Sequence, residues 1–339
     1  MGPLRICAGA FFMSCAWVRV FARHMTALWT RARALLEWRF NEVDPMKIAT
    51  AAYPLDPVRN WAEFSAKLTD WVAGAAGQGA ELLVFPEYGA MELAMLAGPE
   101  AAADLERCLH AVSDVIGDVD DLHSDLAARY GVHILAASAP VFDPAIGARP
   151  VNRARLFSPT GGRGIQDKQI MTRFERDPWD VIPGGGLEIF DTALGKIAIL
   201  ICYDSEFPLL GRAVSEADLL LVPSCTEALA GYTRVRIGAQ SRAMEAQCVS
   251  VMSSIVGYAP WCPAVDEGTG MGGIFGPPDV GFPPNGVIAE GVLNQPGWTY
   301  AEVDLGAVAH VRADGGVLNR LHWDDQGGRH SVPQLRALG

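Results

Sequence analysis

The chain has 339 residues, of which 50% are hydrophobic and 19% are charged, so it can build one large core or two ordinary domains. Its net charge of −12 argues against nucleic acid or an anionic membrane as the main partner, because both are polyanionic. The seven cysteines are widely spaced, without a CxxC pair. This pattern is typical of reduced thiols in the cytoplasm, and it predicts neither a disulfide framework nor a metal site.

Residues 1–45 differ from the rest of the chain. Arginines alternate there with apolar residues, and no acidic residue precedes Glu37. Such a segment fits an amphipathic targeting sequence, or a translation start placed upstream of a natural one at Met46. The apolar run 6–18 is too short to span a bilayer. We interpret residues 1–45 as an N-terminal extension that is either disordered or the product of a mis-assigned translation start.

From Lys47 onward, strand-like and helix-like segments alternate. The order of the segments predicts one α/β domain, which we place at residues 46–312 and follow with a tail at 313–339. Residues 257–286 are rich in glycine and proline and are expected to form a surface loop. The predicted strands are 48–53, 81–85, 133–139, 153–158, 187–191, 196–201, 218–222, 249–255, 285–290 and 298–303, and the predicted helices are 61–76, 105–130 and 235–246.

The strand predicted at 196–201 ends on a cysteine, Cys202. Phe207 and Pro208 follow and indicate the start of a helix. A helix N-terminus close to the thiol would lower its pKa and favour the nucleophilic thiolate. The alternative is a buried cysteine with a purely structural role.

Two other predicted elements place a chemically useful side chain near the end of a strand. Glu87 follows the buried strand 81–85, where partial desolvation would raise its pKa toward that of a general base. Lys168 lies in a polar loop, 164–169. Taken alone, Glu87 would be an ordinary turn residue and Lys168 a solvated surface lysine. Together with Cys202 they supply a base, a cation and a nucleophile at the edge where α/β sheets bind ligands.

These residues belong to motifs that occur in a fixed order. The chain resembles the nitrilase superfamily of carbon–nitrogen hydrolases over about residues 47–311. The resemblance implies a four-layer α-β-β-α sandwich in a single catalytic domain. It rests on LVFPE at 83–87, DK at 167–168, PGG at 183–185, GKI at 195–197, ICYD at 201–204, EFP at 206–208, and RA and EAQ at 242–247.

The resemblance also implies a catalytic triad of Glu87, Lys168 and Cys202. In this scheme Cys202 attacks the substrate carbon, Glu87 moves protons, and Lys168 with the backbone N–H of Tyr203 stabilises the oxyanion. Glu175 is the candidate for a second active-site glutamate, with a salt bridge to a neighbouring arginine, 173 or 176, as the alternative. Relatives often carry a histidine after the lysine, whereas residues 168–171 read KQIM. Further candidates for the pocket wall are Tyr88, Tyr203, Glu227 and Trp261.

The resulting hypothesis is a hydrolase of a small-molecule amide that forms a thioester on cysteine. A nitrilase or an N-carbamoyl hydrolase would use the same triad, and a binding protein that lost turnover would keep the same fold. A papain-like enzyme would need a histidine partner, which nothing near His110, His123 or His133 indicates. The resemblance implies no metal or organic cofactor, and it implies a homodimer or larger assembly with 313–339 as an arm. We expect a cytoplasmic protein.

Overall fold

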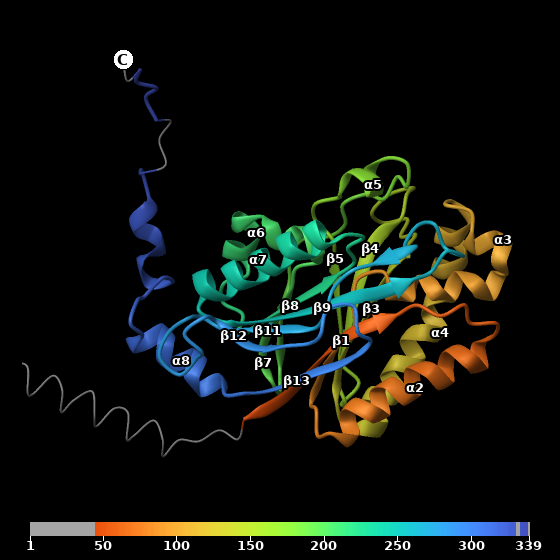
Figure 1. Cartoon of the computed structure of the whole chain (residues 1–339), viewed down its shortest axis with the longest axis horizontal. Coiled ribbons are helices and arrows are strands. Elements are labelled where there is room, and N and C mark those ends of the chain that lie inside the picture. The colour runs from red at the N-terminus through yellow and green to blue at the C-terminus, as the bar shows by residue number, and fades with distance from the viewer. Residues whose placement is uncertain (1–44, 330–332, 338–339) are drawn as a thin grey trace, which may run out of the picture. The chain divides into compact units, whose positions relative to one another are not determined.

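The computed structural model describes residues 45–329 and 333–337, and Figure 1 shows the course of this part of the chain. Our interpretation of an N-terminal extension concerns residues 1–45, of which 1–44 lie outside the described residues. Residues 45–339 group into one compact unit. None of the described helices combines the length and the apolar character that a membrane crossing needs.

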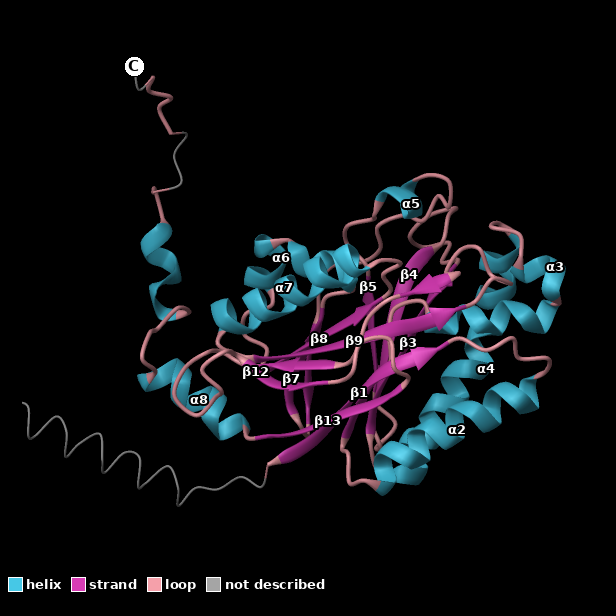
Figure 2. Ribbon diagram, viewed as in Figure 1, coloured by secondary structure: helices cyan, strands magenta, loops and turns pink. Residues whose placement is uncertain are grey.

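The strands form two halves of one continuous sheet system (Figure 2). Their junction is β1, whose last residues run parallel to β9 with Ala52 opposite Ser254. β10 (Glu267–Gly268) pairs only with the end of β9 (Val249–Tyr258). The first half contains β5 (Arg163–Asp167), β4 (Val151–Phe157), β3 (His133–Val141), β2 (Leu82–Val84), β1 (Met46–Pro54) and β13 (Gly297–Val303), and the second contains β6 (Ile189–Thr192), β7 (Gly195–Ile199), β8 (Leu219–Ser224), β9, β11 (Gly273–Phe275) and β12 (Val287–Glu290).

The two halves face each other, and helices cover their outer faces. Successive residues of a strand point to opposite faces, so one strand can serve two cores. In β2, Leu83 joins the core formed with α2 (Trp61–Gly77) and α4 (Arg107–Tyr130). Its neighbour Leu82 joins the core formed with the second half of the sheet and α7 (Leu229–Ala246). The expected four-layer α-β-β-α sandwich is therefore confirmed.

Short helical segments carry the chain from the strands to the loops that surround the site. Two of them matter below, α5 and η2, because they follow β5 and β7. The segments are η1 (Gly89–Ala97), α3 (Pro99–Ala102), α5 (Arg173–Arg176), η2 (Cys202–Glu206), α6 (Pro208–Ala213), α8 (Leu305–Asp314) and η3 (Leu321–Gln326).

Two predictions about local structure were wrong. The segment 164–169 is not a polar loop, because residues Arg163–Asp167 form β5 on the edge of the sheet, where one face stays polar. The glycine-rich segment 257–286 is not all surface, because it contains the buried strand β11 between β9 and β12. A side chain on Gly273 would collide with the ring of Phe275, so glycine is required at that position.

Candidate active site

The structure brings Glu87, Lys168 and Cys202 together beyond the ends of β2, β5 and β7. The Nζ atom of Lys168 lies 2.7 Å from Oε1 of Glu87 and 2.6 Å from Oε2 of Glu175. The Cys202 thiol donates to the Cys225 carbonyl, with the sulfur 3.8 Å from the oxygen, and it lies close enough to Glu87 for their charges to interact. All four side chains are buried. A nucleophile, a base and a cation thus share one water-poor site, with a second carboxylate behind the lysine.

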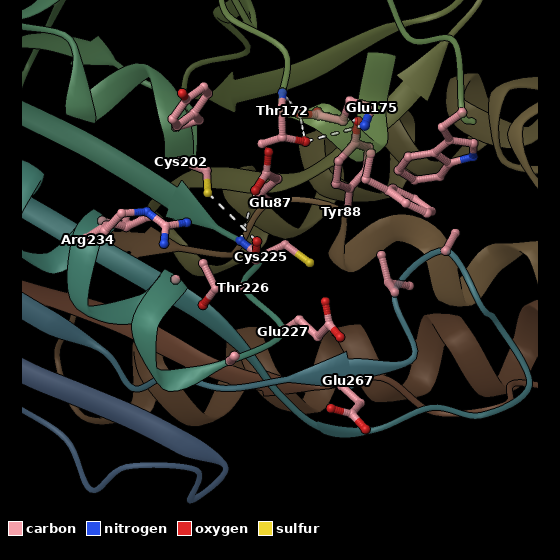
Figure 3. Close-up of a pocket in the computed structure, with 18 of the residues that line it drawn as sticks. Glu87, Tyr88, Thr172, Glu175, Cys202, Cys225, Thr226, Glu227, Arg234 and Glu267 are labelled. Atoms are coloured by element: carbon pink, nitrogen blue, oxygen red, sulfur yellow. Dashed lines mark hydrogen bonds between the residues drawn. The ribbon is translucent and has the colours of Figure 1, made fainter. Parts of the chain in front are cut away.

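These groups line a cavity of about 500 Å³ that opens to solvent. Figure 3 shows Cys202 and Cys225 in the middle of the cavity, with Glu175 and Thr172 on one side and Glu227 and Glu267 on the other. Three of the four wall candidates from the sequence, Tyr88, Tyr203 and Glu227, line it, whereas the fourth, Trp261, does not. Its volume suits a small metabolite rather than a polymer.

Burial sets the protonation states at the triad. It raises the pKa of Glu87, against the opposing charge of Lys168. It also raises the pKa of the Cys202 thiol well above its usual value, and the charge of Glu87 adds to this effect. Burial alone would lower the pKa of Lys168, but the charges of Glu175 and Glu87 raise it well above its usual value. The resting site therefore holds a protonated thiol beside a basic carboxylate and a cationic lysine.

The expected lowering of the thiol pKa by a helix N-terminus was wrong. Helix α6 does begin at Pro208 with Phe207 as its cap, as the sequence indicates, but the 3₁₀ turn η2 separates it from Cys202. The influence of a helix dipole fades within its first turn. The dipole of α6 therefore does not offset the effect of burial on this thiol.

The turn that carries Cys202 has an unusual backbone. Cys202 has a φ of 49°, a left-handed conformation that is uncommon for residues other than glycine. The Ser205 hydroxyl donates to the Cys202 carbonyl at 2.7 Å, and Arg242 donates to the Ser205 carbonyl at 3.1 Å. The Tyr203 N–H has no acceptor within the described residues. The turn therefore leaves the Tyr203 N–H available beside the thiol.

Glu175 is held by a network that does not involve its neighbouring arginines. Thr172 and Glu175 form a capping box, in which the Thr172 N–H and hydroxyl donate to Oε2 of Glu175 at 2.8 and 2.9 Å. The Tyr88 hydroxyl donates to Oε1 at 2.8 Å. Although burial opposes it, Lys168 keeps the pKa of Glu175 below its usual value. The salt bridge runs to Lys168, so the alternative of a pair with an adjacent arginine was wrong.

Asn152 on β4 connects both glutamates, and the sequence analysis missed it. Its Nδ2 atom donates to Oε1 of Glu87 at 3.0 Å and to Oε1 of Glu175 at 3.4 Å. Its Oδ1 atom accepts from Ser138, and its carbonyl accepts from the Lys168 N–H. A fully buried asparagine inside a strand was the available signal, since such groups need partners.

Asp204 is a second missed residue, although it lies inside the cysteine motif. Its carboxylate accepts the N–H groups of Gln169 and Ile170 at 3.0 and 2.8 Å. These contacts fasten the segment after Lys168 to the turn that carries Cys202. Burial raises the pKa of Asp204 to about 7, despite the opposing charge of Lys168. We therefore regard Asp204 as a positioning residue.

We expect Asp204→Asn to change how stability depends on pH. A carboxyl group whose pKa is higher in the folded state stabilises that state at low pH and loses this contribution as pH rises from about 4 to about 7. Asparagine resembles the protonated form throughout. Between pH 4 and 8 the variant should gain up to a few kcal/mol relative to wild type, since one pKa unit corresponds to about 1.4 kcal/mol. Urea unfolding at both pH values measures the difference, and a constant difference would contradict the prediction.

The described histidines lie away from this site. None of the described histidines lines the cavity. His123 is buried on α4, where its Nδ1 atom lies 2.8 Å from the Val119 carbonyl and burial lowers its pKa to about 4. No cluster of three or more potential metal ligands occurs among the residues that the structure describes. The papain-like arrangement is not supported.

Fold and site together define an α/β protein with a buried cysteine, lysine and glutamate pair at one cavity. The carbon–nitrogen hydrolase family model matches residues 47–313, so the chain belongs to this family.

Two curated relatives and one solved structure illustrate the similarity. The probable hydrolase YhcX of Bacillus subtilis is 33% identical over 80% of this chain and 52% of its own length, so the chain spans about half of that relative. The omega-amidase NIT2 of Danio rerio is 25% identical over 71% of this chain and 82% of its own. Nit3 of Saccharomyces cerevisiae, a member of branch 10 of the nitrilase superfamily, has a TM-score of 0.61 at 17% identity and covers 79% of this chain and 93% of its own. At this level of identity, the similarity between Nit3 and this chain is one of fold.

Proposed function

We propose that this protein hydrolyses the amide bond of a small molecule through a thioester on Cys202. The observation that carries the proposal is the buried arrangement of the Cys202 thiol, Glu87 and Lys168 at the base of one cavity. The similarity of the chain to the omega-amidase NIT2 supports an amide rather than another substrate with a carbon–nitrogen bond. The catalytic domain in this proposal spans residues 46–312.

In the first half of the reaction, Glu87 takes the thiol proton while Sγ of Cys202 attacks the carbonyl carbon. The developing oxyanion lies within reach of Lys168 and of the Tyr203 N–H, which has no other acceptor. Because the lysine and the backbone donor are already in place, little reorganisation is needed. Glu87 then gives its proton to the nitrogen, the C–N bond breaks and the amine leaves.

In the second half, a water molecule hydrolyses the thioester. Glu87 accepts a proton from this water and returns it to the departing thiol. Two contacts keep Glu87 oriented for both steps: the Cys225 N–H donates to its Oε2 at 2.9 Å, and Asn152 donates to its Oε1. Glu175 holds Lys168 from the opposite side. The cycle uses only side chains, backbone donors and water.

An activity screen tests this proposal directly. The panel contains amides, nitriles and N-carbamoyl compounds of matched size, with product release followed by mass spectrometry. We expect turnover of amides and a covalent acyl adduct on Cys202 with a slow substrate. Preferential turnover of nitriles or carbamoyl compounds would replace the amide assignment. Failure of every compound to react or to label Cys202 would favour a binding protein on the same fold.

We further propose a cytoplasmic homodimer or larger homo-oligomer. The described cysteines are all free thiols, which agrees with a reducing compartment. The outer faces of α6 and α7 expose large apolar side chains, a common property of protein interfaces. The tail 313–339 is the segment that we propose as an arm onto the partner. The exposed residues are Leu209, Leu229, Ile237 and Met244.

A charge on the outer face of α7 is expected to separate the subunits. Ile237 is 55% exposed, so Ile237→Lys does not disturb the core of the single chain. Buried at an interface, the new ammonium group would be desolvated and unpaired. Sedimentation velocity should show a shift from dimer to monomer, with Val280→Lys as a control because Val280 is 48% exposed in the loop between β11 and β12 rather than on α7. An unchanged sedimentation coefficient would exclude this face as the interface.

A further inference from the structure

The outer part of the catalytic cavity is acidic. Glu206, Glu227, Asp266 and Glu267 line it, and Arg234 is the one arginine among the lining residues. Arg234 is already engaged, since its Nε atom lies 3.5 Å from Oε1 of Glu206. Glu227, Asp266 and Glu267 have no ion-pair partner within the described part of the chain. After the one pair is set aside, three carboxylates remain uncompensated.

These three carboxylates come from two segments that meet at the cavity. Glu227 follows β8, just before α7 begins, and the other two residues lie before and at the start of β10. Figure 3 shows Glu227 and Glu267 on the side of the cavity away from Thr172 and Glu175. Burial is the main cause of the raised pKa of Cys225, deeper in the site, and the charge of Asp266 adds a smaller contribution. Because all three carboxylates line the cavity, they act on the volume that a bound substrate occupies.

The deeper part of the cavity does not offset this charge. Lys168 lies between Glu87 and Glu175, and both carboxylates form ion pairs with it. No unpaired cation among the described lining residues faces the cavity. Carboxylates clustered in a cleft with low-dielectric walls create a negative potential that attracts cations and repels anions. The substrate binds in the catalytic cavity beside the nucleophile, and the acidic wall determines which substrate charge is favoured there.

We propose that the substrate is an amide whose acyl group carries a positive charge, such as an ammonium or a guanidinium, which binds near Glu227, Asp266 and Glu267. This inference rests on the proposed amidase function and deepens it. The thiol sulfur bonds to the carbonyl carbon, the C–N bond breaks, and ammonia leaves with the proton that Glu87 carried. Water then cleaves the thioester to give the ω-amino or ω-guanidino acid and the free thiol.

Three series of linear primary amides test the charge preference. The ω-amino amides of three to six carbons are compared with uncharged alkyl amides and with ω-carboxy amides of the same length. We expect kcat/KM in the order cationic, neutral, anionic, with a ratio of roughly 10 between cationic and neutral compounds. The ratio should fall between 0.05 and 0.5 M salt, because exposed charges are screened. A preference for ω-carboxy amides would overturn the inference and would instead indicate that Arg234 binds the substrate.

Charge-neutralising variants locate the effect. Glu227→Gln and Glu267→Gln should each lower the cationic-to-neutral ratio about 2- to 5-fold, the range expected for partly exposed ion pairs, and the triple variant with Asp266→Asn about 10-fold or more. Glu100→Gln removes the same charge on α3, remote from the cavity, and should leave the ratio unchanged. An unchanged ratio in the triple variant would overturn the inference while leaving the amidase proposal intact.

Binding to the inactive Cys202→Ala variant separates the two proposals. Calorimetry with the same three series measures charge preference without turnover. Tighter binding of ω-amino amides, weakened by the triple substitution, would support a cation-binding wall even if no amide were hydrolysed. Equal affinity for all three series would overturn it even if the wild type proved to be an amidase.

Discussion

Cys202→Ala is expected to lower kcat for any substrate by roughly 10⁴-fold or more, because loss of a covalent nucleophile removes the whole pathway that the other groups serve. The fold should persist. The thiol is small, and alanine tolerates the left-handed backbone at this position about as well as cysteine does. The free energy of unfolding should change by only about 1 kcal/mol. Steady-state kinetics and urea unfolding measure the two effects.

A second cysteine in the same cavity provides the matched control. Cys225 contributes its backbone, since its N–H donates to Glu87 and its carbonyl lies 3.8 Å from the sulfur of Cys202. Its own thiol has no assigned part in the reaction. Cys225→Ala should still acquire an acyl adduct on Cys202, visible by intact-mass spectrometry. An adduct that disappears in Cys225→Ala and persists in Cys202→Ala would reverse the assignment.

The strands that precede Glu87 and Cys202 could be predicted because their sequences are rich in aliphatic residues. β2 and β7 are short and bounded by turn residues, so the aliphatic run and its flanks define them. β5 escaped prediction because an edge strand with the sequence RGIQD carries a polar pattern that a loop would also carry. β11 escaped because glycines flank three residues whose burial depends on neighbours distant in sequence.

The sequence predicted which residues belong to the site better than it predicted the contacts of their side chains. Adjacent arginines were the obvious partners for Glu175, but the capping box at Thr172 turns its carboxylate inward to Lys168. The shift of the thiol pKa was predicted in the wrong direction. The sequence shows a helix start after Cys202, but it shows neither the 3₁₀ turn between them nor how deeply the thiol is buried. Asn152 and Asp204 form hydrogen bonds to residues that are distant in the sequence, and no local sequence pattern predicts such contacts.

Lys168→Met is expected to affect both activity and stability. Methionine keeps the length of the side chain and removes its charge. The oxyanion then loses its side-chain donor, which should lower kcat roughly 10²- to 10³-fold. The same change leaves Glu87 and Glu175 buried without their shared cation, and removal of one partner from a buried ion pair destabilises a protein by about 3–5 kcal/mol.

The stability loss in Lys168→Met should itself depend on pH. Without the lysine, burial and mutual repulsion raise the pKa of the two carboxyl groups in the folded state, so their protonated forms become favoured. A carboxyl group with a raised pKa contributes stability at low pH and loses it as pH rises, so the variant should lie closer to wild type at pH 5 than at pH 8. Urea unfolding at both values measures this difference. Lys196→Met, at an exposed lysine on β7, is the matched control. An equal loss at both pH values would mean that the two carboxylates do not depend on Lys168 for their charge, and the role assigned to this lysine between them would be wrong.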